Sequence, residues 1–303
     1  GRLYIIICFP QSKPSKGARM DKIRIVTDST ADLPEEIINK YKIKVIPLSF
    51  IIDGKVYHDL VDISREEYYR ELMNCKEFPT TSQPTPAEFL DAYNELIAEG
   101  AEKIISIHLS SDLSGTVKGA QMTAQMVKNA EVCVIDSRTA TMGLGLIVLA
   151  TAKAIAAGAD FTEAVRTANQ AVEKSDLFFL LDSLDNLQKG GRNGKAGYLV
   201  GSLLNIKPVL RLHDGEIHAF DKVRGNRENK AMEKMVEDIL NHIDTSKKVY
   251  CAVGYCDNIN QARKMVELLK PHLDCDEYVY MQIGNVVITH IGMGAFGLAF
   301  YQL

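Results

Sequence analysis

The chain has 303 residues, a formal net charge of −4 and 46% hydrophobic residues. At about 100–200 residues per domain, this length predicts two domains. Acidic and basic residues are interspersed and no Lys/Arg stripe alternates with aromatic residues, which argues against nucleic-acid binding. The six cysteines lack C-x-x-C spacing and the seven histidines lack a metal-site spacing. We therefore expect reduced thiols, a cytoplasmic protein, and neither a metal nor a cofactor.

The first residues do not resemble a signal peptide, because the apolar run 3–9 is followed by Pro10 without a small-residue cleavage site. We interpret residues 1–19 as an upstream extension or a segment added in cloning. Globular patterning begins after Met20. The apolar helix expected from Met142 to Ile155 contains Lys153 and is shorter than the ~18–20 residues of a membrane span, so no transmembrane segment is predicted.

Strand and helix patterns alternate through residues 20–172 and predict an N-terminal parallel-sheet α/β/α domain. The strand Ile23–Thr27 leads into a helix with an expected Asp32…Glu35 capping box. A strand over 45–52 and an Asp-Gly turn predict a hairpin. Further elements are expected as a helix capped by Ser64 and Glu67, a helix Pro86–Glu99, a strand Lys103–Leu109, a helix after Ser114, a strand Val132–Asp136, a helix from Met142 and a helix Thr162–Lys174.

Residues 173–303 predict a C-terminal mixed α/β domain, which opens on the continuous apolar strand Leu177–Leu181. A glycine-dense loop over 189–195 follows. The remaining elements are expected as a hairpin turning at Asp214-Gly215, helices Glu228–Ile243 and Ile259–Leu269, and strands Lys248–Gly254, Glu277–Ile283, Val286–Thr289 and Ala295–Tyr301. Two domains of this kind create a cleft between them.

The loop Thr80–Pro86 is rich in hydroxyl groups and contains two prolines. Thr85 and Glu88 complete a capping box and Pro86 suits the first helical position, so the preceding Thr81 and Ser82 are held on rigid backbone. Neutral donors of this kind suit a carboxylate or a phosphate. We interpret the segment as a binding loop.

A second hydroxyl cluster, Ser110–Thr116, stands where a predicted strand runs into a helix. A serine followed by a glycine at such a junction places a hydroxyl and free N–H groups at the positive end of the helix, which favours an anion. Ser114 is therefore a candidate binding residue. The alternative is that Ser114 only caps its helix.

Two Asp-Ser pairs, Asp28-Ser29 and Asp136-Ser137, each follow a predicted strand. If the strands are parallel, both pairs gather with Ser114 beyond the carboxyl edge of the sheet, where open α/β sheets bind ligands. They are possible cleft-lining residues. Simple turn chemistry is the alternative for either pair.

Three motifs that suggest an enzyme fail on context. Gly292–Gly297 matches G-x-G-x-x-G, but no helix or βαβ unit follows it. The loop from Gly190 to Lys195 is one residue short of a phosphate loop and has Ala196 where Ser or Thr must hold magnesium. No G-x-S-x-G elbow surrounds a serine. Nucleotide hydrolysis and serine hydrolysis therefore lack local support.

From about Lys22 to the C-terminus the chain resembles the DegV family of fatty-acid-binding proteins. Seven short motifs stand in the family's order: Asp28–Pro34, Thr81–Pro84, Leu113–Thr116, Asp136-Ser137, Lys189–Arg192, Ile206–Pro208 and Thr289–Gly292. Met293 departs from the pattern, since many members have proline between the glycines, and residues 1–19 are unmatched.

The resemblance implies a two-domain α/β protein that holds a long-chain fatty acid in an apolar tunnel, with its carboxylate at the domain cleft. By motif position, Thr81, Ser82 and Ser114 contact the carboxylate, while Arg192 and His290 flank the head group. Such proteins resemble the binding subunit of bacterial fatty acid kinase, which presents the acid to a separate kinase subunit for acyl-phosphate formation and then supplies a membrane acyltransferase used in phospholipid synthesis. The protein is then a carrier and not itself an enzyme.

Other interpretations stay open. Arg192 alone suits a surface arginine in a glycine loop, and His290 alone suits a core histidine bonded to backbone. A small-molecule hydrolase or transferase that uses cleft serines is the alternative function, and a structural or regulatory interaction protein is a further one.

Overall fold

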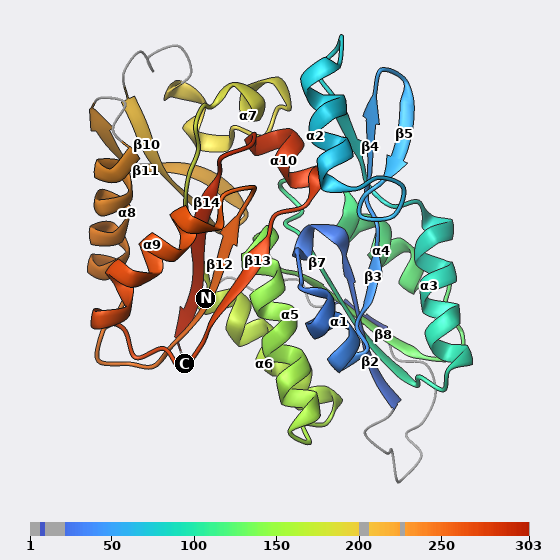
Figure 1. The fold of residues 1–303 in the computed structure, drawn as a ribbon. Helices are drawn as coiled ribbons and strands as arrows, with labels where there is room; N and C mark the ends of the chain where they lie inside the picture. The colour runs from blue at the N-terminus through green and yellow to red at the C-terminus, as the bar shows by residue number, and fades with distance from the viewer. Residues whose placement is uncertain (1–6, 10–21, 200–205, 225–227, 303) are drawn as a thin grey trace.

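The computed structural model describes residues 7–9, 22–199, 206–224 and 228–302, whose strands form three sheets (Figure 1). The first sheet, sheet A, has the order β1-β8-β7-β2-β3, with β2, β7, β8 and β3 parallel and β1 antiparallel at the edge. Its strands are β1 Ile7–Phe9, β2 Ile23–Asp28, β3 Lys44–Ile46, β7 Lys103–His108 and β8 Glu131–Asp136. Residues 7–9 of the expected extension thus pair with the sheet.

Helices cover both faces of sheet A. On one face α3 (Pro86–Ala98) and α4 (Thr116–Ala124) enclose a cluster that includes Val26, Ile104 and Val134. The opposite face packs against α1 (Glu35–Tyr41), α5 (Thr141–Ala156) and α6 (Phe161–Lys174). Because strand side chains alternate between faces, the continuous apolar strands of this sheet supply both cores.

A small antiparallel sheet, sheet B, has the order β5-β4-β6 and lies beside α2 (Arg65–Asn74). Its strands are β4 Ser49–Ile52, β5 Lys55–His58 and β6 Thr80–Ser82. The predicted hairpin and the capping boxes of α2 and α3 are confirmed. The expected single strand over 45–52 is wrong: it divides into β3 and β4 at Pro47, which has no N–H to donate to a ladder.

The third sheet, sheet C, has the order β11-β10-β9-β14-β12-β13 and is mixed, with β12 and β13 parallel. Helices α8 (Glu228–His242) and α9 (Ile259–Leu269) cover one face. Two short helices, α7 (Asp185–Lys189) and α10 (Asn285–Ile291), lie beyond its strands. The strands are β9 Asp176–Leu180, β10 Ile206–His213, β11 Glu216–Arg224, β12 Val249–Tyr255, β13 Tyr278–Gln282 and β14 Phe296–Gln302.

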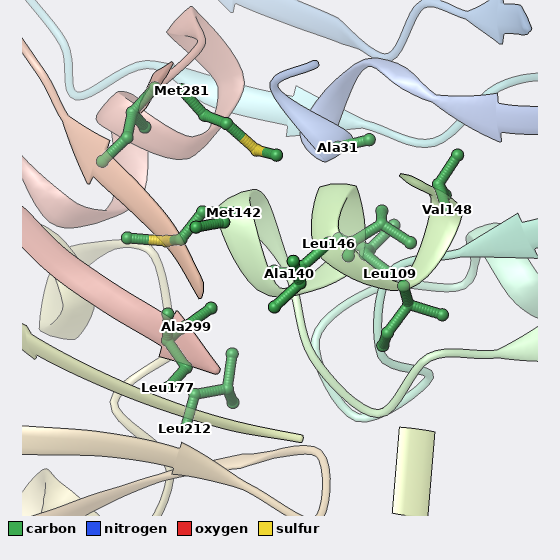
Figure 2. Packing of buried hydrophobic residues seen from close by; sticks show 14 of the residues in the cluster. Ala31, Leu109, Ala140, Met142, Leu146, Val148, Leu177, Leu212, Met281 and Ala299 are labelled. Atoms are coloured by element: carbon green, nitrogen blue, oxygen red, sulfur yellow. The ribbon is translucent and has the colours of Figure 1, made fainter. Parts of the chain in front are cut away.

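Helix α5 packs against both halves of the molecule (Figure 1). Figure 2 shows Met142 extending from α5 toward the strands that carry Leu177 and Ala299, while Val148 lies on the side of Ala31. All five residues belong to one buried cluster. The predicted two-part α/β fold is confirmed, whereas the boundary between 172 and 173 stays a prediction, because α5 and α6 contact both large sheets.

Two further predictions are wrong. The segment expected as strand Val286–Thr289 is helix α10, because tertiary packing of Val286, Ile288 and Thr289 into the core overrides the β propensity of this β-branched run. Asp32 does not cap α1. It adopts a left-handed backbone with φ 51°, and Pro34 precedes the helix without a side-chain cap.

Candidate functional site

A cavity of about 350 Å³ lies between sheets A, B and C. Both halves of the chain line it, and most of its wall is apolar. The polar lining residues are Thr30, Thr81, Ser82, Gln83, Ser114, Thr141, Arg192 and His290. The cavity therefore brings together all five residues predicted for carboxylate binding and for the head group, which stand more than 200 positions apart at their extremes (81 and 290).

A hydrogen bond between Thr81 and His290 joins the two halves at this cavity. Strand β6 places Thr81 opposite Phe50 of β4, and helix α10 carries His290. The Thr81 Oγ1 and His290 Nε2 atoms lie 2.8 Å apart. Helix α10, part of which the sequence predicts as a strand, therefore sets the position of His290 at the cavity.

The His290 ring is partly buried in the cavity wall. Its Nδ1 atom is buried and has no hydrogen-bond partner among the described residues. A Cβ atom on Gly190 would lie 2.3 Å from this Nδ1, so only a glycine lets the ring approach the backbone so closely. Burial and, secondarily, the nearby Arg192 charge lower the pKa of His290 to about 4. The imidazole is neutral at neutral pH.

Ser114 lies one residue before the N-cap of α4, which is Gly115. Its Oγ atom lies 2.9 Å from Thr116 Oγ1 and accepts from the Thr116 amide at 3.3 Å. A Cβ atom on Gly115 would meet Gln83 Oε1 at 2.0 Å, so this glycine allows the two hydroxyl-rich loops to meet. The loops predicted to form one site are therefore adjacent at the helix start.

Ser82 and Arg192 both line the cavity but differ in their hydrogen bonds to the protein. Ser82 is exposed, and its hydroxyl donates only to the Gln83 carbonyl at 3.3 Å. Arg192 donates from Nε to the Leu113 carbonyl at 3.3 Å and from Nη1 to the Gly190 carbonyl at 2.6 Å. These bonds hold the guanidinium beside His290. We call Thr81, Ser82 and Ser114 the cavity cluster.

The four residues Asp28, Ser29, Asp136 and Ser137, which we call the edge cluster, follow parallel strands as expected, yet none is among the cavity lining. Asp136 accepts from the amides of Ser111 and Arg138, and Ser137 donates to the Thr139 carbonyl. Ser29 accepts from the Leu48 amide. Turn and loop chemistry, the alternative left open by the sequence, accounts for these contacts.

Asp28 anchors a buried network that the sequence did not reveal. Its carboxylate accepts from the Thr30 and Leu109 amides and lies 2.9 Å from His108 Nδ1. His108 Nε2 in turn lies 2.7 Å from Ser106 Oγ. This Ser-His-Asp arrangement has the spacing of a catalytic triad, but the three side chains are fully buried and none lines the cavity. It joins β2 and β7 at the carboxyl ends of these two neighbouring strands.

Two further buried carboxyl groups, those of Asp32 and Asp59, face the start of α10. Asp32 Oδ1 accepts from the Gly284 amide at 2.9 Å, and its Oδ2 lies 2.6 Å from the Thr141 hydroxyl. Both Asp32 and Thr141 have left-handed backbones, with φ 51° and 48°. Such backbones are uncommon for non-glycine residues and persist only where surrounding contacts enforce them.

Desolvation raises the pKa of Asp32 to about 8 and that of Asp59 to about 6. The Asp59 carboxylate faces Ser29 and the amides of Asn285 and Val286, but no hydrogen bond of standard geometry joins them. Sequence reasoning missed both roles. The signal was present in the motif Asp28–Pro34, where Asp32 was assigned to a helix cap.

No group of three or more His, Cys, Asp or Glu side chains suited to a metal ion occurs within residues 7–9, 22–199, 206–224 and 228–302. Within the same ranges, every helix is too short or too polar to cross a membrane.

Comparison with known proteins places these features in a family. Residues 22–303 match the model described as "Uncharacterised protein, DegV family". A DegV domain-containing protein of Listeria monocytogenes is 36% identical over 283 residues, covering 92% of this chain and 98% of the relative. Another from Deinococcus radiodurans is 36% identical over 281 residues, covering 93% and 99%.

Solved structures agree. A DegV family protein from Thermus thermophilus, described by its fatty acid binding, has a TM-score of 0.86 at 31% identity and covers 93% of this chain and 100% of its own. A stearic acid-binding protein from Eubacterium ventriosum has a TM-score of 0.85 at 28% identity, with coverage of 92% and 98%. The matched residues include both halves of the cavity, and we conclude that the chain belongs to the DegV family.

Proposed function

We propose that the protein binds one long-chain fatty acid, with the acyl chain in the apolar cavity and the carboxylate at the cavity cluster. The observation that carries this proposal is the cavity itself, because its mostly apolar wall also contains Thr81, Ser114 and a neutral His290. Relatives from Thermus thermophilus and Eubacterium ventriosum that are described as fatty acid-binding and stearic acid-binding support the same ligand class.

Energetics divide the roles of the two ends. An acyl chain of about fourteen methylenes contributes roughly 11 kcal/mol before association costs, at ~0.8 kcal/mol each. Each hydrogen bond to the carboxylate contributes ~1.5–3 kcal/mol. The apolar wall therefore sets affinity, and the hydroxyl groups of the cavity cluster set orientation.

We further propose that the bound acid is presented to a separate kinase subunit for acyl-phosphate formation and that the product passes to a membrane acyltransferase. Hydroxyl donors leave a carboxylate oxygen nucleophilic, whereas a bidentate arginine would sequester both oxygens. Arg192 bonds two carbonyls and not a carboxylate. Its charge remains available to a phosphate added at the head group. This role belongs in the cytoplasm, where ATP is present.

The alternative, an enzyme that uses cleft serines, gains little from the geometry. Within the part of the chain that the structure describes, neither Ser82 nor Ser114 is hydrogen-bonded to a histidine. Thr81 does pair with His290, but the opposite ring nitrogen has no orienting partner within the described residues. Nucleophile activation by a triad requires that third group.

One experiment tests both parts. Denaturing the purified protein and extracting it with organic solvent should release about one equivalent of fatty acid, measured by mass spectrometry. Adding a fatty acid kinase subunit and ATP to a second, native portion of the protein should yield ADP only when the acid is bound. An empty protein refutes the ligand, and ATP hydrolysis by this chain alone, lost on a substitution within it, refutes the carrier role.

A further inference from the structure

Two glycines, Gly254 and Gly297, face each other on neighbouring strands of sheet C, and we call this pair the trough. The ladder registers align one row across the sheet: Leu210 pairs with Phe179, Phe179 with Gly297, Gly297 with Gly254, and Gly254 with Met281. The large side chains of this row belong to the same buried cluster as α5. This row therefore has two adjacent positions without side chains between Phe179 and Met281.

Met142 of α5 fills part of this trough. Its side chain lines the cavity and extends toward sheet C (Figure 2). A Cβ atom on Gly254 would lie 2.1 Å from Met142 Cε and 2.9 Å from its Sδ, so the thioether tip rests directly on the glycine backbone. One methionine thus touches both the cavity and the trough.

The nature of this side chain suits a movable wall. Methionine is unbranched, has three rotatable bonds and adapts to irregular gaps. The neighbouring lining residue Phe179 is a rigid ring, held in register between β10 and β14. Of these two walls, Met142 is the one that changes shape without moving the backbone.

We propose that Met142, whose tip rests on Gly254, sets the acyl-chain length that this protein accepts. The inference rests on the proposed function, since it assumes that the cavity holds a fatty acid. Truncating Met142 to alanine removes three heavy atoms and opens the trough to about two or three further methylenes. At ~0.8 kcal/mol per methylene, each added carbon favours the longer acid by about fourfold.

Gly254 gives the opposite test. An alanine at this position must push the flexible tip of Met142 out of the trough and into the cavity, which shortens the space for a chain. Gly297 is unsuited to the same test, because a Cβ atom there would lie 2.3 Å from the Phe178 carbonyl oxygen, a backbone atom that cannot give way.

The experiment loads each protein with an equimolar mixture of even-numbered saturated acids from dodecanoic to eicosanoic and measures the extracted profile by mass spectrometry. Met142→Ala should raise the ratio of the acid two carbons longer than the wild-type optimum to the optimum acid by about fifteenfold, the product of two added methylenes. Gly254→Ala should shift the profile toward shorter acids. Met142→Leu, a volume-conserving change, should keep the wild-type profile.

Leu144→Ala is the matched control, since Leu144 is fully buried on the same helix and is not among the cavity lining. It should lower stability and leave the profile unchanged. If Met142→Ala does not fold, the Gly254→Ala profile decides. This inference alone is overturned if the wild type carries fatty acid and the folded Met142→Ala and Gly254→Ala variants keep its profile. An empty wild-type protein overturns the proposed function and this inference with it.

Discussion

The edge cluster and the cavity cluster are both polar and both contain serines, but only the cavity cluster lines the cavity. Asp28, the anchor of the edge cluster, has its carboxylate fully occupied by amides and His108 inside the protein. Ser82 and Ser114 of the cavity cluster have hydroxyls that make one or two weak local contacts and face the cavity. The two clusters differ in unused hydrogen-bonding capacity, and the binding role proposed for the cavity cluster requires such capacity.

The largest expected effect comes from Asp28→Ala. Removing one partner of the buried Asp28–His108 pair should cost about 3–5 kcal/mol of unfolding free energy, because His108 and the Leu109 amide are left without an acceptor. Urea unfolding measures this loss, with Ser82→Ala, on an exposed side chain, as the control. A stable Asp28→Ala protein that has lost its lipid would reverse the roles of the two clusters.

The triple substitution Thr81→Ala, Ser82→Ala, Ser114→Ala should lower kinase-coupled turnover by ~10²-fold or more, because a carboxylate that has lost these donors tilts from its reactive position. Lipid affinity should fall less, since the chain is held mainly by apolar contacts. Ser137→Ala, in the edge cluster, should leave turnover unchanged. Unaltered affinity and turnover in the folded triple variant would place the head group elsewhere.

Asp32→Asn should change how stability depends on pH. The unfolded chain ionises Asp32 near 3.8, whereas the folded protein keeps the proton until the pKa of about 8, so wild-type stability falls as pH rises between these values. Asp59 contributes a similar fall only up to its pKa of about 6. Between pH ~6 and ~8, the wild type should therefore lose about 2 kcal/mol more than Asp32→Asn. If the unfolding free energies of the wild type and of Asp32→Asn change equally with pH over this window, the pKa of Asp32 is not raised.

The smallest effect is expected at Arg192 and His290, which flank the cavity cluster. Arg192→Ala and His290→Ala should keep near wild-type lipid occupancy and slow kinase-coupled turnover about tenfold, the value of one hydrogen bond to a charged group. Extraction and turnover are measured on the same preparations. A folded variant that purifies empty makes that residue a primary ligand.

The sequence predicted the fold class and the residues that meet at the cavity, because strand alternation, capping boxes and hydroxyl loops are local signals. Thr85 and Glu88 are an example: their spacing alone defines the start of α3. The family resemblance supplied Arg192 and His290. That these residues bind a head group as assigned remains a prediction.

Two failures share one cause, which is that contacts distant in sequence decided the local structure. Asp32 was assigned to a cap, but its partners Thr141 and Gly284 lie more than 100 residues away in sequence. The β-branched run in α10 favours a strand until it packs against the core. The edge cluster is a different case: Asp136 accepts from the amides of Ser111 and Arg138 and is not among the cavity lining, and a cleft-lining role for the cluster stays a prediction.

Helix α5 carries a consequence for how this protein can evolve. The same helix packs on sheet A and on sheet C, so a substitution that shifts α5 against one sheet also shifts it against the other. A half-gene taken from a relative would bring an α5 fitted to a foreign partner. The two sheets are therefore inherited together and must diverge in step, although each strand of the described residues belongs to one sheet only.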